Sequence, residues 1–314
     1  MSKDKTKKKK PRIYTMANIK KDMRMNWSLY LLVLPVITFF FLFEYKPMYG
    51  ALIAFQDYRP AKGFGAKWVG LKHFERFIKN PYFFRLVGNT LSINLQSLIF
   101  GFPAPIILAL ILNEMKNSKF KTLSQTVMYL PHFISTVIIC GLIVNFCRTD
   151  GLFNDIIVIF GGERFAMLSS KPMYQPIYVA SGIWQGVGWG TIVYVAALTG
   201  IDHELYDAAS VDGAGKWKQT LHVTIPGIAP TIITMLILRM GGLMGLGHEK
   251  TLLLYNEYIY DVSDVISTYV YRLGMTDQQY SYSTAVNMFG QVISITLLIT
   301  ANKISRKVSE TSLW

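Results

Sequence analysis

The sequence predicts an all-α membrane protein, and three observations support this fold class. Of its 314 residues, 51% are hydrophobic and 16% are charged, whereas soluble domains carry about 25% charged residues. The apolar residues gather in runs of about 20, which is the length that a helix needs to cross a bilayer. Ten of the 32 lysines and arginines lie in the first 24 residues. A basic segment before an apolar run favours the cytosolic side of a membrane, although a nucleic-acid-binding arm has a similar composition.

Six segments are long and apolar enough to span the membrane as helices: residues 28–45, 87–112, 124–147, 175–199, 227–247 and 284–302. No small-residue cleavage site follows the first segment, so we interpret it as an uncleaved helix and not as a signal peptide. Residues 152–160 are too short to span and are expected to form a re-entrant or interfacial turn. The predicted organisation is a basic cytosolic tail (1–27), a six-helix transmembrane domain (28–302) and a cytosolic C-terminal tail (303–314).

The distribution of basic residues predicts the orientation. With a cytosolic N-terminus, the inner segments hold 18 lysines and arginines and the outer loops hold 13. Because basic residues stay inside, both termini are expected in the cytosol. Eight of the 13 outer residues lie between Lys46 and Arg85, where an amphipathic helix at the membrane interface would account for them. Residues at helical spacing would form its apolar face, namely Trp68, Leu71, Phe74, Phe77 and Ile78.

The segment 202–226, between the fourth and fifth predicted spans, carries the signals of a short helix. Asp202 is a good N-cap, and Glu204 lies in the first turn, where a carboxylate complements the helix dipole. Gly213 follows Asp212 and suits the end of the helix. Most loops between spans are short polar connectors, so this degree of organisation indicates a specific role.

Small residues give this predicted helix a low profile. Ala208 and Ala209 lie within it, and Trp217 belongs to a second short helix after it. Pro226 is expected to start the next span, at a position that needs no N–H. A low-profile helix can lie in a groove of a partner protein. The alternative, an ordinary capped helix at the membrane interface, stays open on these residues alone.

The same segment resembles the EAA loop in permease subunits of bacterial ABC importers. The pattern of that family is E-A-A, three residues, G, nine residues and I-x-L-P. Here Asp207-Ala208-Ala209 is followed by three residues and Gly213, and nine more lead to Val223-Thr224-Ile225-Pro226. The spacing is intact, and the three departures are conservative: Asp for Glu, Val for Ile and Ile for Leu. In that family the loop is the coupling helix that docks in a cleft of the ATPase.

Five further stretches resemble the LplB-type sugar permeases of Gram-positive bacteria. They are YKPMYGALIAFQDY (45–58), NTLSINLQSLIFGFPAPIILALILNEM (89–115), YLPHFIST (129–136), WQGVGWG (184–190) and YNEYIYDVSDVISTYVYRLG (255–274). Together with the loop, they extend the resemblance from about residue 25 to Trp314. The resemblance implies the type I permease fold of ABC importers, with six transmembrane helices and a cytosolic coupling helix, in a bacterial cytoplasmic membrane.

The resemblance also implies the import of an oligosaccharide and a set of partners. These are a second permease subunit, a cytosolic ATPase dimer and an extracellular sugar-binding lipoprotein. ATP and Mg would be bound by the ATPase and no cofactor by this chain, whose sequence has no G-x-x-x-x-G-K-[ST] phosphate loop. A role in coupling to the ATPase is implied for Glu204, Asp207, Ala208, Ala209, Asp212, Gly213 and Pro226.

Polar side chains inside the predicted spans are candidates for a substrate pathway. Three helical faces carry amides, hydroxyls or an aromatic ring, which suit the hydroxyl groups and the apolar face of a sugar. The candidate residues are Asn89 and Gln96, Gln185 and Trp189, and Asn287 and Gln291. Hydrogen bonding between helices is the alternative for each of these faces.

Arg239 lies near the middle of the fifth predicted span, where a charge costs ~2.5–3.5 kcal/mol on insertion scales. Its side chain is expected to face the protein interior and to pair with carbonyls or amides. An anionic sugar such as a uronate is the alternative partner.

Two other function classes fit the sequence less well. An ion-coupled secondary transporter of a small polar solute usually needs a carboxylate inside the membrane, but every aspartate and glutamate lies in a loop or at a span edge. A membrane enzyme needs a catalytic or metal-binding constellation, and the five histidines show no metal-ligand spacing. Cys140 and Cys147 lie in an apolar segment and are expected to be small packing residues. We therefore expect a transport subunit without a catalytic or metal site.

Overall fold

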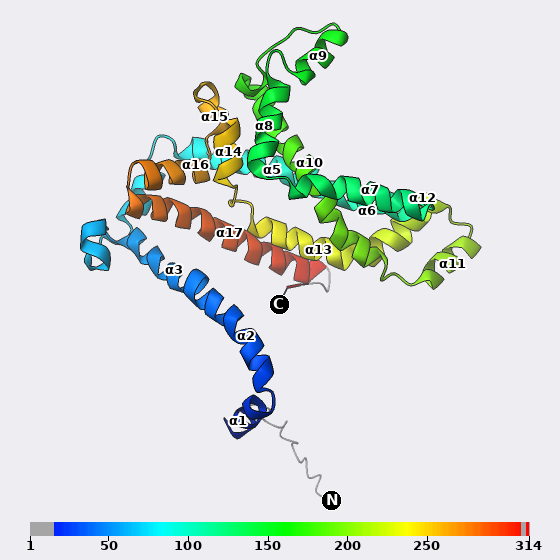
Figure 1. The fold of residues 1–314 in the computed structure, drawn as a ribbon, viewed down its shortest axis with the longest axis horizontal. Coiled ribbons are helices and arrows are strands. Elements are labelled where there is room, and N and C mark those ends of the chain that lie inside the picture. The colour runs from blue at the N-terminus through cyan, green and yellow to red at the C-terminus, as the bar shows by residue number, and fades with distance from the viewer. Residues whose placement is uncertain (1–15, 309–311, 314) are drawn as a thin grey trace, which may run out of the picture. The chain divides into compact units, whose positions relative to one another are not determined.

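The computed structural model describes residues 16–308 and 312–313. This part of the chain is built from helices and contains no strand, apart from an isolated bridge between Gln56 and Trp68. Most of the predicted basic tail, up to residue 15, lies outside the described residues. The chain divides into an N-terminal unit, residues 1–52, and a large unit, residues 53–314 (Figure 1).

The N-terminal unit is a helical segment. Its elements are α1 (Met16–Met25), α2 (Trp27–Phe39), a π-helical turn (Phe40–Tyr45), α3 (Lys46–Met48) and the start of a 3-10 segment (Tyr49–Phe55). The helical backbone therefore continues beyond residue 45, where the first predicted span ends. Within this unit α2 buries none of its side chains. A helix that is apolar all round needs lipid or protein around it.

Five long helices form the centre of the large unit (Figure 1). They are α5 (Phe83–Gly101), α6 (Pro103–Glu114), α10 (Lys171–Leu198), α13 (Ile225–Gly241) and α17 (Tyr280–Val308). The break between α5 and α6 falls at Pro103, whose ring nitrogen carries no hydrogen for a helical bond. α10 packs against α5 and α6, and α13 packs against both α10 and α17. The last helix reaches Val308, so part of the predicted C-terminal tail belongs to α17.

Five stretches of the described chain are long and apolar enough to cross a membrane: Trp27–Phe55, Phe83–Glu114, Thr136–Ile159, Lys216–Gly241 and Tyr280–Lys307. The predicted fourth span, 175–199, is not among them although it forms most of α10. Its glycines, amides and tyrosines keep even its most apolar part below the hydropathy of these five stretches. The helical membrane fold is confirmed, whereas the number of six spans stays a prediction.

The prediction of one helix over 124–147 is wrong. The backbone forms α7 (Ser118–Tyr129), a 3-10 turn (Leu130–Phe133) and then α8 (Thr136–Cys147). Pro131 lies in the turn, and the extended residue Ser135 caps α8 by accepting a hydrogen bond from the next turn. α8 consequently points away from α7 in Figure 1. The following stretch, expected to be a turn over 152–160, forms the short helix α9 (Leu152–Ile159).

Shorter helices connect the long ones. They are α4 (Lys72–Ile78), α11 (His203–Val211), α12 (Lys216–Gln219), α14 (His248–Leu254), α15 (Tyr260–Ser263) and α16 (Ile266–Tyr271). The expected amphipathic helix from Trp68 onward is wrong in its extent, because only α4 is helical. Part of the predicted apolar face packs on protein: the Phe77 side chain is fully buried, and its ring lies 5.3 Å from that of Phe289 on α17. Trp68, Leu71 and Ile78 are more than half exposed, so the position at the membrane interface stays a prediction.

The largest core cluster lies between α8, α10 and the segment around residues 254–265. Cys140 and Cys147 are both buried in it as free thiols, beside the fully buried Tyr174. Their predicted role as small packing residues is confirmed. Two smaller clusters hold α4 and α16 against α17, and α6 and α10 against the start of α13.

A buried ion pair joins α5 to the segment that follows α15. Asp264 is fully buried, and both of its carboxylate oxygens accept hydrogen bonds from Arg272, at 2.9 and 2.7 Å. Arg85 of α5 lies 3.5 Å from the same carboxylate. Removing one member of such a group leaves an uncompensated buried charge, which costs far more than losing an exposed pair.

We expect Asp264→Ala to destabilise the protein by about 3 kcal/mol, because Arg272 loses its partner. The apparent midpoint of thermal unfolding in detergent should fall by about 5 to 10 °C. Asp261→Ala is the matched control: its carboxylate pairs with Lys171, and both side chains are about half exposed, so the cost should stay below about 1 kcal/mol. Equal midpoints for both variants would contradict a structural role of the buried pair.

Candidate functional site

The segment 202–226 contains the predicted short helix, which is α11. The Asp202 carboxylate accepts a hydrogen bond from the Glu204 N–H at 3.0 Å and thereby caps the first turn. This cap satisfies one of the four N–H groups that a helix start leaves without partners. The prediction of Asp202 as the N-cap is confirmed.

The end of α11 is a Schellman motif. The Ala214 N–H donates to the Ala209 carbonyl at 2.9 Å, and the Gly213 N–H donates to the Ser210 carbonyl at 3.1 Å. Gly213 has φ of +73°, a conformation that a residue with a Cβ adopts only with strain. The predicted stop at Gly213 is confirmed, with Asp212 as the C-cap.

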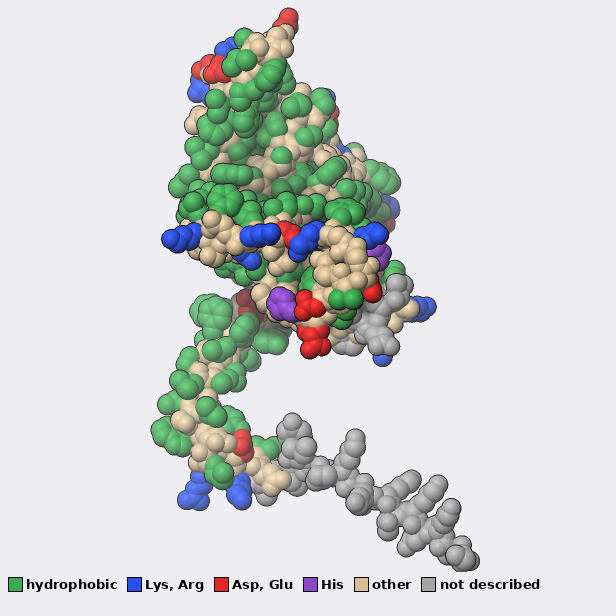
Figure 2. Space-filling model, turned by 90° about the vertical axis from the view of Figure 1, so that its right-hand side faces the viewer, with side chains coloured by type: hydrophobic (Ala, Val, Ile, Leu, Met, Phe, Trp, Pro, Cys, Tyr) green, Lys and Arg blue, Asp and Glu red, His purple; other side chains and the backbone are tan. Residues whose placement is uncertain are grey.

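The surface of this segment is exposed and partly apolar. Asp207 and Ala208 are exposed on α11, and Ala209 is half-buried. Val211 is 88% exposed and Trp217 is 74% exposed, so this surface carries apolar area. Figure 2 views the large unit from this end, where acidic, basic and histidine side chains lie near one another. Such a surface is suited to contact with another protein.

Pro226 lies in the first turn of α13, as predicted, but it does not start the helical run. The helix begins ten residues earlier, at Lys216, and runs without a break to Gly241. Just before Pro226 the backbone takes π-helical geometry over Thr220–Thr224. Pro226 has no N–H to donate, and a π turn is one way for a helix to continue past such a residue.

Two side-chain contacts tie α11 to this long helix. Gln219 is buried, and its amide donates to the Ser210 hydroxyl at 2.9 Å and to the Ala214 carbonyl at 3.0 Å. The Tyr206 hydroxyl lies 3.0 Å from the Thr224 hydroxyl. Sequence reasoning missed both contacts, because no residue pattern shows how two short helices fold against each other. α11 is therefore joined to α13 by side chains as well as by the backbone.

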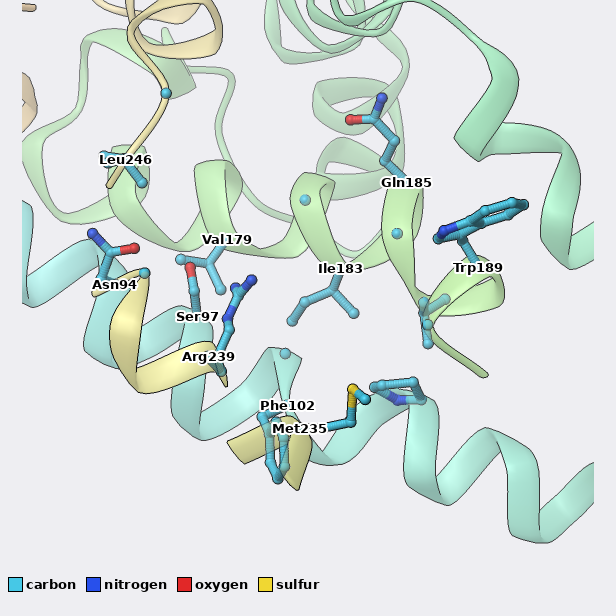
Figure 3. Close-up of a pocket in the computed structure, with 18 of the residues that line it drawn as sticks. Asn94, Ser97, Phe102, Val179, Ile183, Gln185, Trp189, Met235, Arg239 and Leu246 are labelled. Atoms are coloured by element: carbon cyan, nitrogen blue, oxygen red, sulfur yellow. The ribbon is translucent and has the colours of Figure 1, made fainter. Parts of the chain in front are cut away.

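A cavity of about 650 Å³ lies among α5, α6, α10, α13 and the loop that follows α13 (Figure 3). Most of its lining is apolar or glycine. Its polar lining groups come from different elements: Asn94, Ser97, Tyr178, Gln185, Trp189, Tyr194, Arg239 and Lys250. Among the residues that the structure describes, no aspartate or glutamate lines the cavity.

Gln185 and Trp189 are the two predicted pathway residues that line this cavity. The Gln185 amide donates to the Ile134 carbonyl at 3.4 Å. One face of the Trp189 indole stacks on His132, with ring centroids 4.5 Å apart and planes 7° apart. The indole is still 48% exposed. It thus keeps free surface toward the cavity, where Figure 3 shows it at the edge.

Asn89 lies away from the cavity and makes a structural contact. Its side chain is buried, and its amide donates to the carbonyls of Asp261 and Asp264 at 3.0 and 2.9 Å. These carbonyls lie far along the chain, so Asn89 holds α5 to the segment after α15. Its place in a substrate pathway has no support from this geometry.

Gln96 takes part in a hydrogen-bond network between helices. Its amide donates to the Gln175 side-chain oxygen at 2.6 Å, and the Ser92 hydroxyl donates to the same oxygen at 2.8 Å. The Gln175 amide in turn donates to the Val262 carbonyl at 3.0 Å. Gln96 therefore forms the hydrogen bonds between helices that were the alternative to a role in the substrate pathway.

Asn287 and Gln291 lie four residues apart on α17, and both side chains are exposed. They do not line the cavity. Two amides on the exposed face of an apolar helix are poorly solvated by lipid tails, where a polar group lacks partners. This face of α17 is therefore better suited to protein or water than to lipid.

No group of three or more histidine, cysteine, aspartate or glutamate side chains in the described chain is placed to hold a metal ion. The candidate site consists of an exposed helix joined to a long span, and a mostly apolar cavity with several polar lining groups beside that span.

Residues 101–300 match the model of the family described as binding-protein-dependent transport system inner membrane component. The chain belongs to this family. Two similar permeases are found in Bacillus subtilis. Protein LplB is 44% identical over 95% of this chain and 93% of its own length. The polygalacturonan/rhamnogalacturonan transport system permease protein YteP is 44% identical over 91% of this chain and 90% of its own.

A solved structure has the same fold as this permease. It belongs to a bacterial ABC transporter involved in the import of the acidic polysaccharide alginate. The matched chain is 39% identical, with a TM-score of 0.84 over 93% of this chain and 99% of that chain. A second structure of the alginate transporter, in complex with an alginate pentasaccharide-bound periplasmic protein, matches equally well. The permease is therefore a multi-pass membrane protein of the ABC importer type.

We expect Gln219→Leu to loosen α11 from the span helix, because two hydrogen bonds are lost. Each contributes about 0.5 to 1.5 kcal/mol, so amide hydrogen exchange within α11 should accelerate about tenfold or more. Mass spectrometry of the deuterated permease measures this rate. Gln291→Leu, an exposed glutamine on α17, is the control and should leave α11 unchanged. Unchanged exchange in Gln219→Leu would show that the backbone alone holds α11.

Proposed function

We propose that the chain is one permease subunit of an ATP-driven importer that moves an oligosaccharide across the bacterial cytoplasmic membrane. The relative YteP is named as a permease of a polygalacturonan/rhamnogalacturonan transport system, and the similar solved structure is an ABC transporter involved in the import of alginate. The observation that carries the proposal is the helix α11, capped at both ends and joined to a span. It has the residue spacing of the EAA loop.

In this proposal α11 faces the cytosol and docks in a cleft of the ATPase dimer. The exposed apolar side chains of Leu205, Val211 and Trp217 supply area for that contact, and Asp207 and Asp212 add charge at its rim. The ATPase subunits bind ATP and Mg, and this chain contributes the docking helix. Both chain termini lie on the cytosolic side.

Closure of the ATPase moves α11, and the movement passes to the membrane through fixed contacts. Gln219 and the Tyr206–Thr224 pair join α11 to the run that becomes α13. The C-terminal end of α13, which carries Arg239, lines the cavity. A tilt of this one helix therefore changes the shape of the cavity, which is how hinge and shear motions couple separate sites.

A second permease subunit completes the pathway. The exposed amides of Asn287 and Gln291 on α17 are expected to face that subunit or the channel between the two permeases, because lipid would leave them without partners. An extracellular sugar-binding lipoprotein delivers the oligosaccharide to the pair. Gln185 and Trp189 contact the sugar in the cavity, through an amide and a ring face.

Gly213→Trp should leave the permease in the membrane and abolish its coupling to the ATPase. The substitution strains the backbone by about 1 kcal/mol or more, and the indole would stand in the docking surface, where no atom now lies within 4 Å of a Cβ. Co-purification of the ATPase and sugar-stimulated ATP hydrolysis measure the effect. Asp207→Ala should act in the same direction but more weakly.

The control for Gly213→Trp is Gly161→Trp. Gly161 also has positive φ, at +82°, and open space around its Cβ position, but it follows α9. This variant should keep the ATPase bound. Wild-type binding and stimulation in Gly213→Trp would mean that α11 is only a capped connector.

Trp189→Ala should lower sugar uptake into vesicles about tenfold, because a buried aromatic contact is worth about 1 kcal/mol beyond its area. Asn287→Ala should also lower sugar uptake, and it should lower the amount of assembled importer less than it lowers uptake. Trp184→Ala is the matched control for the tryptophan: it lies on the same helix and is 49% exposed, but it does not line the cavity. Normal uptake in Trp189→Ala and Asn287→Ala would assign both residues to packing.

A further inference from the structure

The cavity carries two positive side chains and no negative one among the described residues. Arg239 comes from the last turn of α13, and Lys250 comes from α14. No salt bridge joins either side chain to a carboxylate in the described part of the chain, although Asp264, Asp261 and other acids nearby in sequence are paired. Arg239 is exposed and Lys250 is half-buried. A cation beside a mostly apolar lining is stabilised by an anion or by several dipoles close to it.

Lys250 has two partners, and neither carries a full negative charge. Its ammonium donates to the Tyr178 carbonyl at 2.7 Å and lies 4.5 Å from the centre of the Tyr178 ring. Burial lowers the pKa of Lys250 to about 8, because removal from water disfavours the charged form. Gly182 leaves room beside it, since a Cβ there would approach the ammonium to 3.2 Å. One or more N–H bonds of Lys250 are thus left for a ligand.

Arg239 has no hydrogen-bond partner for its side chain among the described residues. Its guanidinium extends from α13 toward α10, in the space near Val179 and Ile183 (Figure 3). A guanidinium presents a planar fork of N–H donors, which matches the two oxygens of a carboxylate. The expected pairing of Arg239 with carbonyls or amides is therefore not found, and the alternative of an anionic partner gains support.

The neighbouring lining groups fit the rest of an acidic sugar. Asn94, Ser97 and Gln185 offer amide and hydroxyl groups to sugar hydroxyls, and Trp189 offers a ring face. The two cations come from separate elements, and each brings one charge. Separate single charges suit monoanionic groups spaced along an oligomer better than one dianionic phosphate, which is bound by converging donors.

We propose that Arg239 and Lys250 bind carboxylate groups of an acidic oligosaccharide, one built from uronate units, as it passes through the permease. This proposal rests on the proposed function and names the substrate class for the same cavity. A neutral sugar would leave both cations without a counter-charge. The cavity therefore selects for acid groups in addition to the selection made by the binding protein.

The test uses the complete importer in proteoliposomes, with its binding protein and ATPase. Uptake is compared for short galacturonan and alginate oligomers, their methyl esters, a neutral oligomer and a sugar phosphate. The wild-type importer should take up one of the uronate oligomers at least about tenfold faster than its ester, because hydrogen bonds to charged groups are stronger than those to neutral groups.

Two charge-removing variants locate the selection in the cavity. Arg239→Gln and Lys250→Gln should each lower uptake of the acidic oligomer about tenfold and change uptake of its ester less than about twofold. Arg239→Lys and Lys250→Arg keep the charge and should recover part of the uptake. Lys303→Gln, at an exposed position on α17, controls for the loss of one positive charge and should behave as wild type. ATPase co-purification should be equal for all variants.

The outcomes separate this inference from the proposed function. ATP-dependent uptake of a neutral oligomer or of the esters at equal or greater rates would overturn the inference and leave the importer intact. Faster uptake of the sugar phosphate than of the uronate oligomers would also overturn the inference. So would an equal loss of uptake for the acidic oligomer and for its methyl ester in both Arg239→Gln and Lys250→Gln. No ATP-dependent uptake of any saccharide would overturn the proposed function itself.

Discussion

Inside a bilayer, every backbone N–H and C=O must find its partner within protein, and the whole chain is organised by this constraint. The described chain meets it with helices, so what matters is how each proline is accommodated. At Pro131 the helix ends in a 3-10 turn, and α8 starts again from the Ser135 cap. At Pro226 the helix passes through a π turn and continues. The first solution lets the chain change direction, and the second gives one continuous helix.

That continuous helix links the two parts of the candidate site. The run from Lys216 to Gly241 has 26 residues and is about 39 Å long at 1.5 Å per residue. Its first turns hold α11 through Gln219, and its last turn carries Arg239 into the cavity. One continuous helical run therefore contacts both α11 and the cavity. Coupling between them needs no chain of intermediate side chains, only a displacement of this helix.

The sequence predicted best those features that depend on neighbouring residues. The cap at Asp202 and the stop at Gly213 are local backbone chemistry, so their positions were predicted correctly. Apolar runs predicted which segments are helical but not where the backbone breaks, which is why the single helix over 124–147 was wrong. The sequence could not predict tertiary contacts. Asn89 donates hydrogen bonds to carbonyls more than 170 residues away in the chain. Lys250 lies between two predicted spans, yet the fold brings it to the cavity.

The two fixed positive charges in the cavity also bear on the energy of transport. A bacterial membrane is negative inside, so each carboxylate that enters moves against the electric field at about 2.3 kcal/mol per 100 mV. Fixed cations along the pathway lower the electrostatic barrier that an anion meets on its way. They leave the total work of transport unchanged, because the anion no longer interacts with them once it has reached the other side. For a polyanionic substrate that work grows with every acid group carried. The cations would therefore set the speed of passage, while the length of oligomer that can be accumulated would be limited by the energy that the ATPase supplies per cycle.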